Sequence, residues 1–143
     1  MEVREMFGFT IEGPPMGKQR HRVSRGRMYT PRPTAEYEAK VEEACMAEMK
    51  RRDMVMYSPG EPLGIQVLAY YPIPKSWSKK KQMQAVMGLI APTTKPDADN
   101  VLKIVMDGLN GIIYEDDKQI VFAEVKKIYS TEPCVEVGIW REI

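Results

Sequence analysis

Acidic side chains lie at both ends of one short stretch, the run KPDADNVLKIVMDGLNGIIYEDDKQIV from Lys95 to Val121. Asp97 and Asp99 open it, one residue apart, and the cluster Glu115–Asp117 follows near its end. If a helix and a turn fold these ends toward each other, the carboxylates repel and need a cation to neutralise them. The alternative is that Asp97 or Asp99 caps a helix and that the second cluster is a solvated turn.

The residues between the two acidic clusters predict a helix that would position them. Its apolar stripe is predicted to consist of Leu102, Val105, Met106 and Leu109. Its polar stripe is predicted to consist of Asp99, Lys103 and Asp107, spaced four residues apart. Asn110-Gly111 is typical of a helix end, because glycine accepts the left-handed conformation found there. Lys103 then lies about one turn inside the helix, where it forms an exposed salt bridge or offsets negative charge on a phosphate.

The order of these residues resembles the RusA family of Holliday junction resolvases. The shared pattern is P-D-x-D-N-x-x-K-x-x-x-D-x-L followed by D-D-x-Q-I. In this chain the pattern consists of Pro96, Asp97, Asp99, Asn100, Lys103, Asp107, Leu109, Asp116, Asp117, Gln119 and Ile120. A D-x-D pair alone is a weak signal, but the ordered combination is specific. The resemblance is strong over this stretch and loose elsewhere.

The resemblance implies a homodimeric, magnesium-dependent endonuclease that nicks four-way DNA junctions. It assigns catalysis to Asp97, Asp99, Lys103 and Asp117, with the three aspartates as metal ligands. Asp107 and Asp116 are secondary candidates that would hold Lys103. Mg²⁺ favours carboxylates and water, and two such ions supply an activated water and relieve charge on the leaving oxygen. Mn²⁺ is expected to substitute.

Composition excludes several other classes of protein. The chain has 143 residues, 43% hydrophobic and 29% charged, which is ordinary for one globular domain. The single histidine, His21, excludes a multi-histidine zinc site, and the two distant cysteines match no metal-ligand spacing. No apolar run is long enough to span a membrane, and the N-terminus has no signal-peptide pattern. We therefore expect a cytoplasmic, nucleoid-associated protein of bacterial or phage origin, with reduced cysteines.

Basic residues are concentrated in two acid-free runs, although the net charge is only +1. One run lies between Glu12 and Glu36, and the other between Glu61 and Asp97. From these runs the predicted DNA contacts are Lys18, Arg20, Arg22, Arg25, Arg27, Lys79, Lys80, Lys81 and Lys95. Arginine forks match phosphate oxygens, which suits recognition of the DNA backbone. The alternative is that both runs are solvated loops.

The rest of the chain predicts an α+β fold in which a mixed sheet is covered by about three helices. Alternation of apolar residues predicts strands at 6–12, 63–71, 120–129 and 135–139, the last two pairing antiparallel, and a short hairpin turns at Ser24–Arg27. A helix is predicted to start at an N-cap Thr34, with Glu36 and Glu38 in its first turn. Another starts near Ser78, with Met83, Val86 and Met87 as its apolar face, and Trp77 either stacks on DNA or anchors this segment.

Together these features predict one RusA-like endonuclease domain over residues 1–143 that resolves branched DNA by paired symmetric nicks in recombination and repair. A homodimer is expected because one acidic cluster cuts one strand, whereas a four-way junction needs two matching cuts. Two alternatives remain at this stage. The protein could be a metal-dependent nuclease without junction preference, including a nucleotide phosphohydrolase, or a non-catalytic junction-binding protein.

Overall fold

The centre of the molecule is a four-stranded mixed sheet with the strand order β1-β6-β4-β5. The computed structural model describes residues 5–142. The strands are β1 (Phe7–Glu12), β4 (Leu63–Pro72), β5 (Ile120–Ser130) and β6 (Cys134–Arg141). They form where the sequence alternates, and the side chains of Phe7, Phe9 and Ile11 are buried on one face of β1 as predicted. The predicted α+β fold with a mixed sheet and three helices is confirmed.

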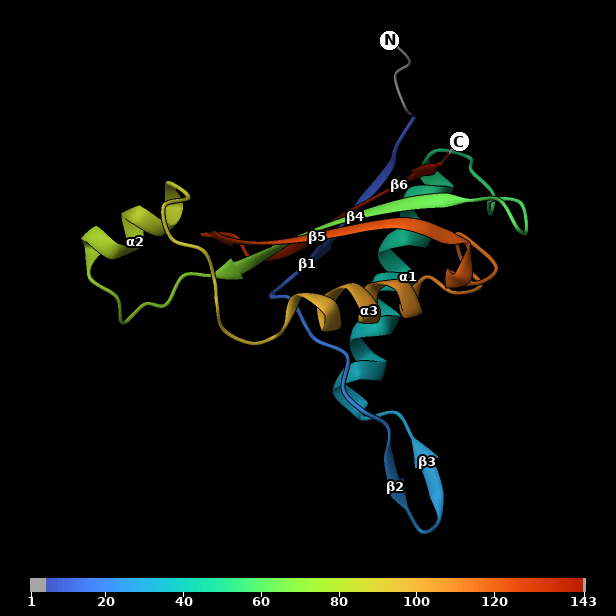
Figure 1. Ribbon diagram of the computed structural model, residues 1–143, viewed down its shortest axis with the longest axis horizontal. Helices are drawn as coiled ribbons and strands as arrows, with labels where there is room; N and C mark the ends of the chain where they lie inside the picture. Colours follow the sequence, from blue (N-terminus) through green and yellow to red (C-terminus); the bar gives the residue numbers. More distant parts are fainter. Residues whose placement is uncertain (1–4, 143) are drawn as a thin grey trace.

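Two helices pack on one face of this sheet, α1 (Arg32–Arg51) and α3 (Ala98–Gly108). Figure 1 shows α3 below the sheet and α1 passing behind the strands and continuing downward, with α2 (Lys79–Val86) extending to one end of the molecule. Gly108 brings α1 and α3 close together, because a Cβ atom there would lie 3.0 Å from Val41 Cβ. No helix in residues 5–142 is both long enough and apolar enough to cross a membrane.

The prediction that the last two strands pair with each other is wrong. β6 pairs antiparallel with β1 and with β4, and β5 pairs parallel with β4. Helices α2 and α3 form the crossover that parallel strands require. The segment that contains α3 therefore runs from the end of β4 back to the beginning of β5.

Helix α1 begins earlier than predicted. Pro31 occupies the N-cap position, and Thr34 is a buried residue inside the first turn. The Thr34 hydroxyl donates a hydrogen bond to Gln19 Oε1 over 3.2 Å, so it fastens the preceding loop instead of capping the helix. The first turn has no acidic residue among those described, so the predicted placement of Glu36 and Glu38 is also wrong. The periodicity of the helix also predicts a buried stripe of Tyr37, Val41, Ala44 and Cys45; Tyr37, Val41 and Cys45 are buried, and Ala44 is half-buried.

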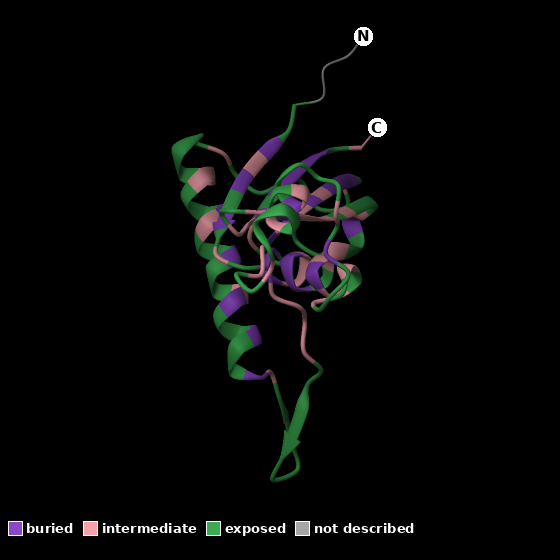
Figure 2. Ribbon diagram, turned by 90° about the vertical axis from the view of Figure 1, so that its left-hand side faces the viewer, coloured by how far each residue is buried: buried purple, intermediate pink, exposed green. Residues whose placement is uncertain are grey.

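A two-stranded hairpin, β2 (Arg22–Ser24) and β3 (Arg27–Tyr29), projects away from the domain. Its turn has positive φ angles at Arg25 (52°) and Gly26 (75°), which match the turn type of short hairpins. Figure 2 shows the hairpin exposed along its length. The predicted turn at Ser24–Arg27 is confirmed.

Helix α2 begins as predicted but packs differently. The Ser78 hydroxyl accepts a hydrogen bond from the Lys81 N–H over 3.2 Å, which confirms the N-cap. Met83, Val86 and Met87, predicted as the apolar face, are exposed, and Ala85 is the buried residue. Trp77 packs edge-on against Tyr129 at 5.3 Å between ring centroids, so Trp77 anchors this segment to β5.

Candidate active site

The first two aspartates lie at the N-terminal end of α3 with their carboxylates exposed. Asp97 is the N-cap residue, but its side chain accepts no capping hydrogen bond from the described helix backbone. Asp99 lies in the first turn. The Tyr71 hydroxyl donates a hydrogen bond to the Pro96 carbonyl over 2.5 Å, which fixes the entrance of the helix to the end of β4. Burial and then the charge of Asp97 raise the pKa of Tyr71 to about 12.

The buried face of α3 differs in part from the predicted stripe. Val105 and Leu109 are buried as expected, whereas Leu102 and Met106 are half-buried. The other buried residues are Val101, Ile104 and Gly108. Of the predicted polar stripe, Asp99 and Lys103 are exposed, with the Lys103 side chain 61% exposed, whereas Asp107 is half-buried.

At the other end of α3, Asp107 is shared by two lysines. Lys103 Nζ lies 3.7 Å from Asp107 Oδ2, and Lys18 Nζ lies 3.2 Å from the same oxygen. Lys18 Nζ also donates a hydrogen bond to Glu38 Oε1 of α1 over 2.5 Å. The Lys18 side chain is only 13% exposed, so its charge is used to hold α1, α3 and the loop before the hairpin together. Of the predicted DNA contacts, Lys18 is therefore the one that the fold directs inward.

Asp116 and Asp117 have different roles in the turn after α3. The Asp116 carboxylate accepts a hydrogen bond from the Lys118 N–H over 2.8 Å and caps the short 3₁₀ turn η1 (Asp117–Gln119). This bond is the main cause that lowers the pKa of Asp116. The Asp117 N–H donates a hydrogen bond to Asn110 Oδ1 over 2.9 Å, which fixes the backbone of Asp117.

Asp117 lies in a strongly acidic environment. Burial, then its contacts with Asp116 and Asp107, raise the pKa of its carboxyl above the ordinary value. Burial and neighbouring carboxylates both disfavour the charged form of a carboxyl group. The sequence predicts only that Asn110 lies at the helix end, and it gives no sign that Glu38 pairs with Lys18. Neither the Asp117–Asn110 hydrogen bond nor the Lys18–Glu38 contact follows from residue spacing.

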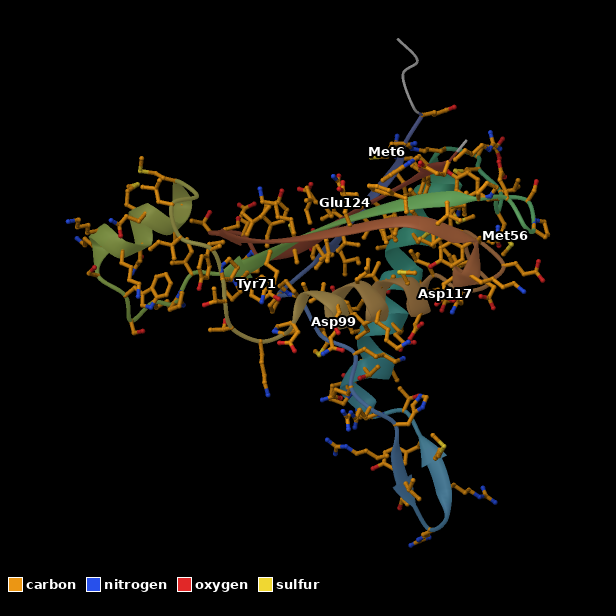
Figure 3. All side chains as sticks on the ribbon, in the orientation of Figure 1. Met6, Met56, Tyr71, Asp99, Asp117 and Glu124 are labelled. Carbon is orange, nitrogen blue, oxygen red and sulfur yellow. The ribbon has the colours of Figure 1, made fainter. Side chains whose placement is uncertain are left out.

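The structure does not bring Asp97, Asp99 and Asp117 together within one chain. Figure 3 shows Asp99 and Asp117 at opposite ends of α3. Within residues 5–142, no group of three or more Asp, Glu, His or Cys side chains is arranged to hold a metal ion. The expected convergence of the two acidic clusters therefore does not occur inside a single protomer, and the predicted set of three ligands does not fit an ion there.

A groove of about 490 Å³ adjoins Asp97 and leads toward the hairpin. It is lined by the loop Pro15–Gln19, by Lys95–Asp97 and by Asn100. The Lys18 N–H donates to the Asn100 carbonyl over 3.0 Å, which holds the loop against α3. Only glycine fits at position 17, because a Cβ atom there would lie 2.8 Å from Pro96 Cβ. The base of the arginine hairpin is thereby fixed next to the first acidic pair.

The other predicted DNA contacts lie on two projections near this end of α3. Arg22, Arg25 and Arg27 are exposed on the hairpin, and Arg20 is exposed just before it. Lys79, Lys80 and Lys81 are exposed in the first turn of α2, with Lys81 Nζ 4.0 Å from the centre of the Trp77 ring. Lys95 is exposed beside Asp97. Figure 1 shows the hairpin and α2 extending in different directions, with the start of α3 between them.

Replacement of Lys18 by methionine is expected to lower the free energy of unfolding by about 2 kcal/mol, because Glu38 and Asp107 would lose their shared cation. Burial lowers the pKa of Lys18, but Glu38 and Asp107 outweigh it and raise that pKa above 10.5. Lys18 therefore stabilises the fold fully below about pH 10.5, and this contribution is lost as the pH rises through the raised pKa.

Urea unfolding at pH 7 and pH 11 measures both the loss of stability in the methionine variant and its pH dependence. Lys18→Arg, which keeps the charge, is the control, and equal stability of the methionine variant would contradict the expectation.

Comparison with known proteins supports the resemblance of this sequence to the RusA family. The family described as endodeoxyribonuclease RusA matches residues 12–140. The uncharacterized protein YqaN of Bacillus subtilis strain 168 is 41% identical over 139 residues, covering 94% of this chain and 95% of YqaN. The crossover junction endodeoxyribonuclease rusA of Lactococcus phage r1t is 27% identical over 140 residues, covering 93% of this chain and 95% of the phage protein.

Proposed function

Because the chain belongs to the RusA family of endodeoxyribonucleases, we propose that it nicks four-way DNA junctions during recombination and repair. The observation that carries this proposal is the exposed Asp97–Asp99 pair, which lies between two basic projections at the start of α3. A relative that covers nearly the whole chain is named a crossover junction endodeoxyribonuclease, which supports the same substrate.

The chemistry is hydrolysis of a phosphodiester bond, with Mg²⁺ or Mn²⁺ as the cofactor. Asp97, Asp99 and Asp117 are proposed as the carboxylate ligands, contributed by two protomers because α3 keeps Asp117 apart from the other two within one chain. A bound ion would supply an activated water and offset charge on the leaving oxygen. Lys103 lies between the two acidic ends on the same exposed face of α3, where its ammonium can neutralise a phosphate. Asp107 orients Lys103, since its carboxylate lies 3.7 Å from the ammonium.

The DNA backbone is held by the hairpin and by α2. The exposed arginines of the hairpin and the lysines of α2 offer donors to phosphates on either side of the acidic pair. Lys95, beside the groove that contains Asp97, is placed to contact the phosphate nearest the cut. Because two matched nicks need two sites, the active form is proposed to be a homodimer with two-fold symmetry.

Cleavage of a four-way junction and of a linear duplex of the same sequence, with and without Mg²⁺, tests this function. We expect paired nicks in the junction, little cutting of the duplex, and none without a divalent ion. Equal cutting of both substrates would instead indicate a nuclease without junction preference. Binding of the junction with no cutting at any divalent ion concentration would indicate a non-catalytic binding protein.

A further inference from the structure

A second pocket, of about 350 Å³, adjoins the groove that contains Asp97. Its volume lies within the range of roughly 300–1,000 Å³ that is typical of ligand sites. Its walls are prolines and three aromatic rings, those of Tyr71, Trp77 and Tyr129. This aromatic pocket and the groove share Pro15, Lys95 and Pro96, so the two hollows are neighbouring parts of one surface.

The aromatic walls are held in place by the fold. Tyr71 and Tyr129 are buried, and they pair in register on the parallel strands β4 and β5, so their rings lie on the same face of the sheet. The Tyr71 hydroxyl is bonded to the Pro96 carbonyl. The Gln82 side-chain amide donates a hydrogen bond to the Trp77 carbonyl over 2.8 Å, which fixes the backbone there. A ligand that enters a pocket built in advance loses less affinity to the ordering of its walls.

Lysines surround the rings of the aromatic pocket. Lys81 Nζ lies 4.0 Å from the centre of the Trp77 ring, and Lys127 Nζ lies 4.9 Å from the centre of the Tyr71 ring. Lys95 is exposed between the aromatic pocket and the groove. Flat apolar walls with a cationic rim are complementary to a nucleotide, because its base stacks on aromatic rings and its phosphate is an anion.

We propose that the aromatic pocket binds one unstacked base of the DNA substrate, next to the phosphate that is cut. This inference rests on the proposed function. With its base between the aromatic walls, a nucleotide can place its phosphate at Lys95, beside the groove that contains Asp97. Because every base has a face that stacks, the pocket is expected to accept any of the four bases.

The aromatic pocket would also favour branched DNA over linear duplex. A base at a branch point has lost the continuous stack of a duplex on one side, which lowers the cost of unstacking it. The same base inside a linear duplex has to leave two stacked neighbours and its paired partner before it can enter the pocket. The pocket therefore gives one chain a means of distinguishing a junction from a duplex.

Replacement of Trp77 tests the protein side of this contact. Trp77→Leu keeps an apolar side chain but removes the ring, and it is expected to weaken binding of a labelled four-way junction about tenfold. Trp77→Phe, which keeps a ring, should bind nearly as tightly as the wild type. The matched control is Phe122→Leu, which removes an exposed ring at the opposite end of β5 and should leave binding unchanged. Fluorescence anisotropy without divalent ions measures binding, and circular dichroism checks the fold. Binding by Trp77→Leu at the wild-type affinity would overturn the inference.

Junctions that lack a base test the DNA side with the wild-type protein, so this result does not depend on how a variant folds. Each junction lacks the base at one position near the branch point, and the position is the same in all four strands. We expect one such position to weaken binding by the wild type about tenfold or more. At that position Trp77→Leu should cause no further loss, because the missing base and the missing ring belong to one interaction.

The inference is wrong if no position weakens binding, or if the losses from the missing base and from Trp77→Leu add in full. Both measurements are made without cutting. A wild type that shows the expected losses but does not nick junctions would therefore support the inference and contradict the proposed function. A wild type that nicks junctions and shows neither loss would contradict the inference alone.

Discussion

Asp97→Asn is expected to reduce junction cleavage at least about a thousandfold while the protein stays folded. Loss of a ligand removes several kcal/mol of charge stabilisation, and each 1.36 kcal/mol is about tenfold in rate. The helix start should be unaffected, because asparagine is as good an N-cap residue as aspartate. Asp99→Asn and Asp117→Asn should have the same effect on cleavage. Asp117→Asn should also keep or raise stability at neutral pH, since burial, Asp116 and Asp107 disfavour its charge.

Single-turnover cleavage, together with thermal unfolding followed by circular dichroism, measures these effects. Asp53→Asn is the matched control, because Asp53 is an exposed aspartate after α1 whose positive φ of 54° asparagine also tolerates. The control should cut at the wild-type rate. Near-normal cleavage by all three site variants would show that these aspartates do not form the active site.

Removal of the four arginines around the hairpin is expected to weaken junction binding a hundredfold or more at about 0.1 M salt. Arg20, Arg22, Arg25 and Arg27 are exposed, so alanine at these positions should leave the core intact. If each arginine neutralises one phosphate, the slope of log affinity against log salt should become shallower by about 3.6, because each contact contributes about 0.9.

Fluorescence anisotropy with a labelled four-way junction, repeated over a series of salt concentrations, measures the slope. Lys50→Ala/Arg51→Ala is the control, since these basic residues lie in the last turn of α1, at the end away from the hairpin. The control should change the slope little. A slope that is unchanged by the four hairpin substitutions would place the DNA-binding surface elsewhere on the protein.

Elements governed by local chemistry could be predicted from the sequence. The turn at Arg25-Gly26 needs two positive φ angles, and the Ser78 cap needs one hydroxyl at a helix start. Alternation of apolar residues identified β1 and β4, because a buried strand face requires it. Alternation does not show which strands lie next to each other in the sheet, however. That β6 lies between β1 and β4 depends on contacts between residues far apart in the chain.

The residues of the candidate site were nominated by the family motif, and their roles stay predictions. The motif points to Asp97, Asp99, Lys103 and Asp117, but it could not show that α3 holds the aspartates apart. Helix α3 is apolar around much of its circumference, so spacing alone could not select its buried face. Contact of Gly108 with Val41 on α1 decides that orientation. Lys18 was assigned to DNA because the sequence gives no sign that Glu38 and Asp107 converge on it.

The strand order also determines when the protein can fold during synthesis. Phe7 of β1 pairs with Ile139 of β6, and β6 both follows the other three strands of this sheet in the chain and joins β1 to β4. Until residues 134–141 emerge, β1 has no partner strand and the sheet cannot close. Contacts this distant in sequence are typical of slow folding. Under the proposed function, a nascent chain therefore remains unable to cut DNA until β6 is in place.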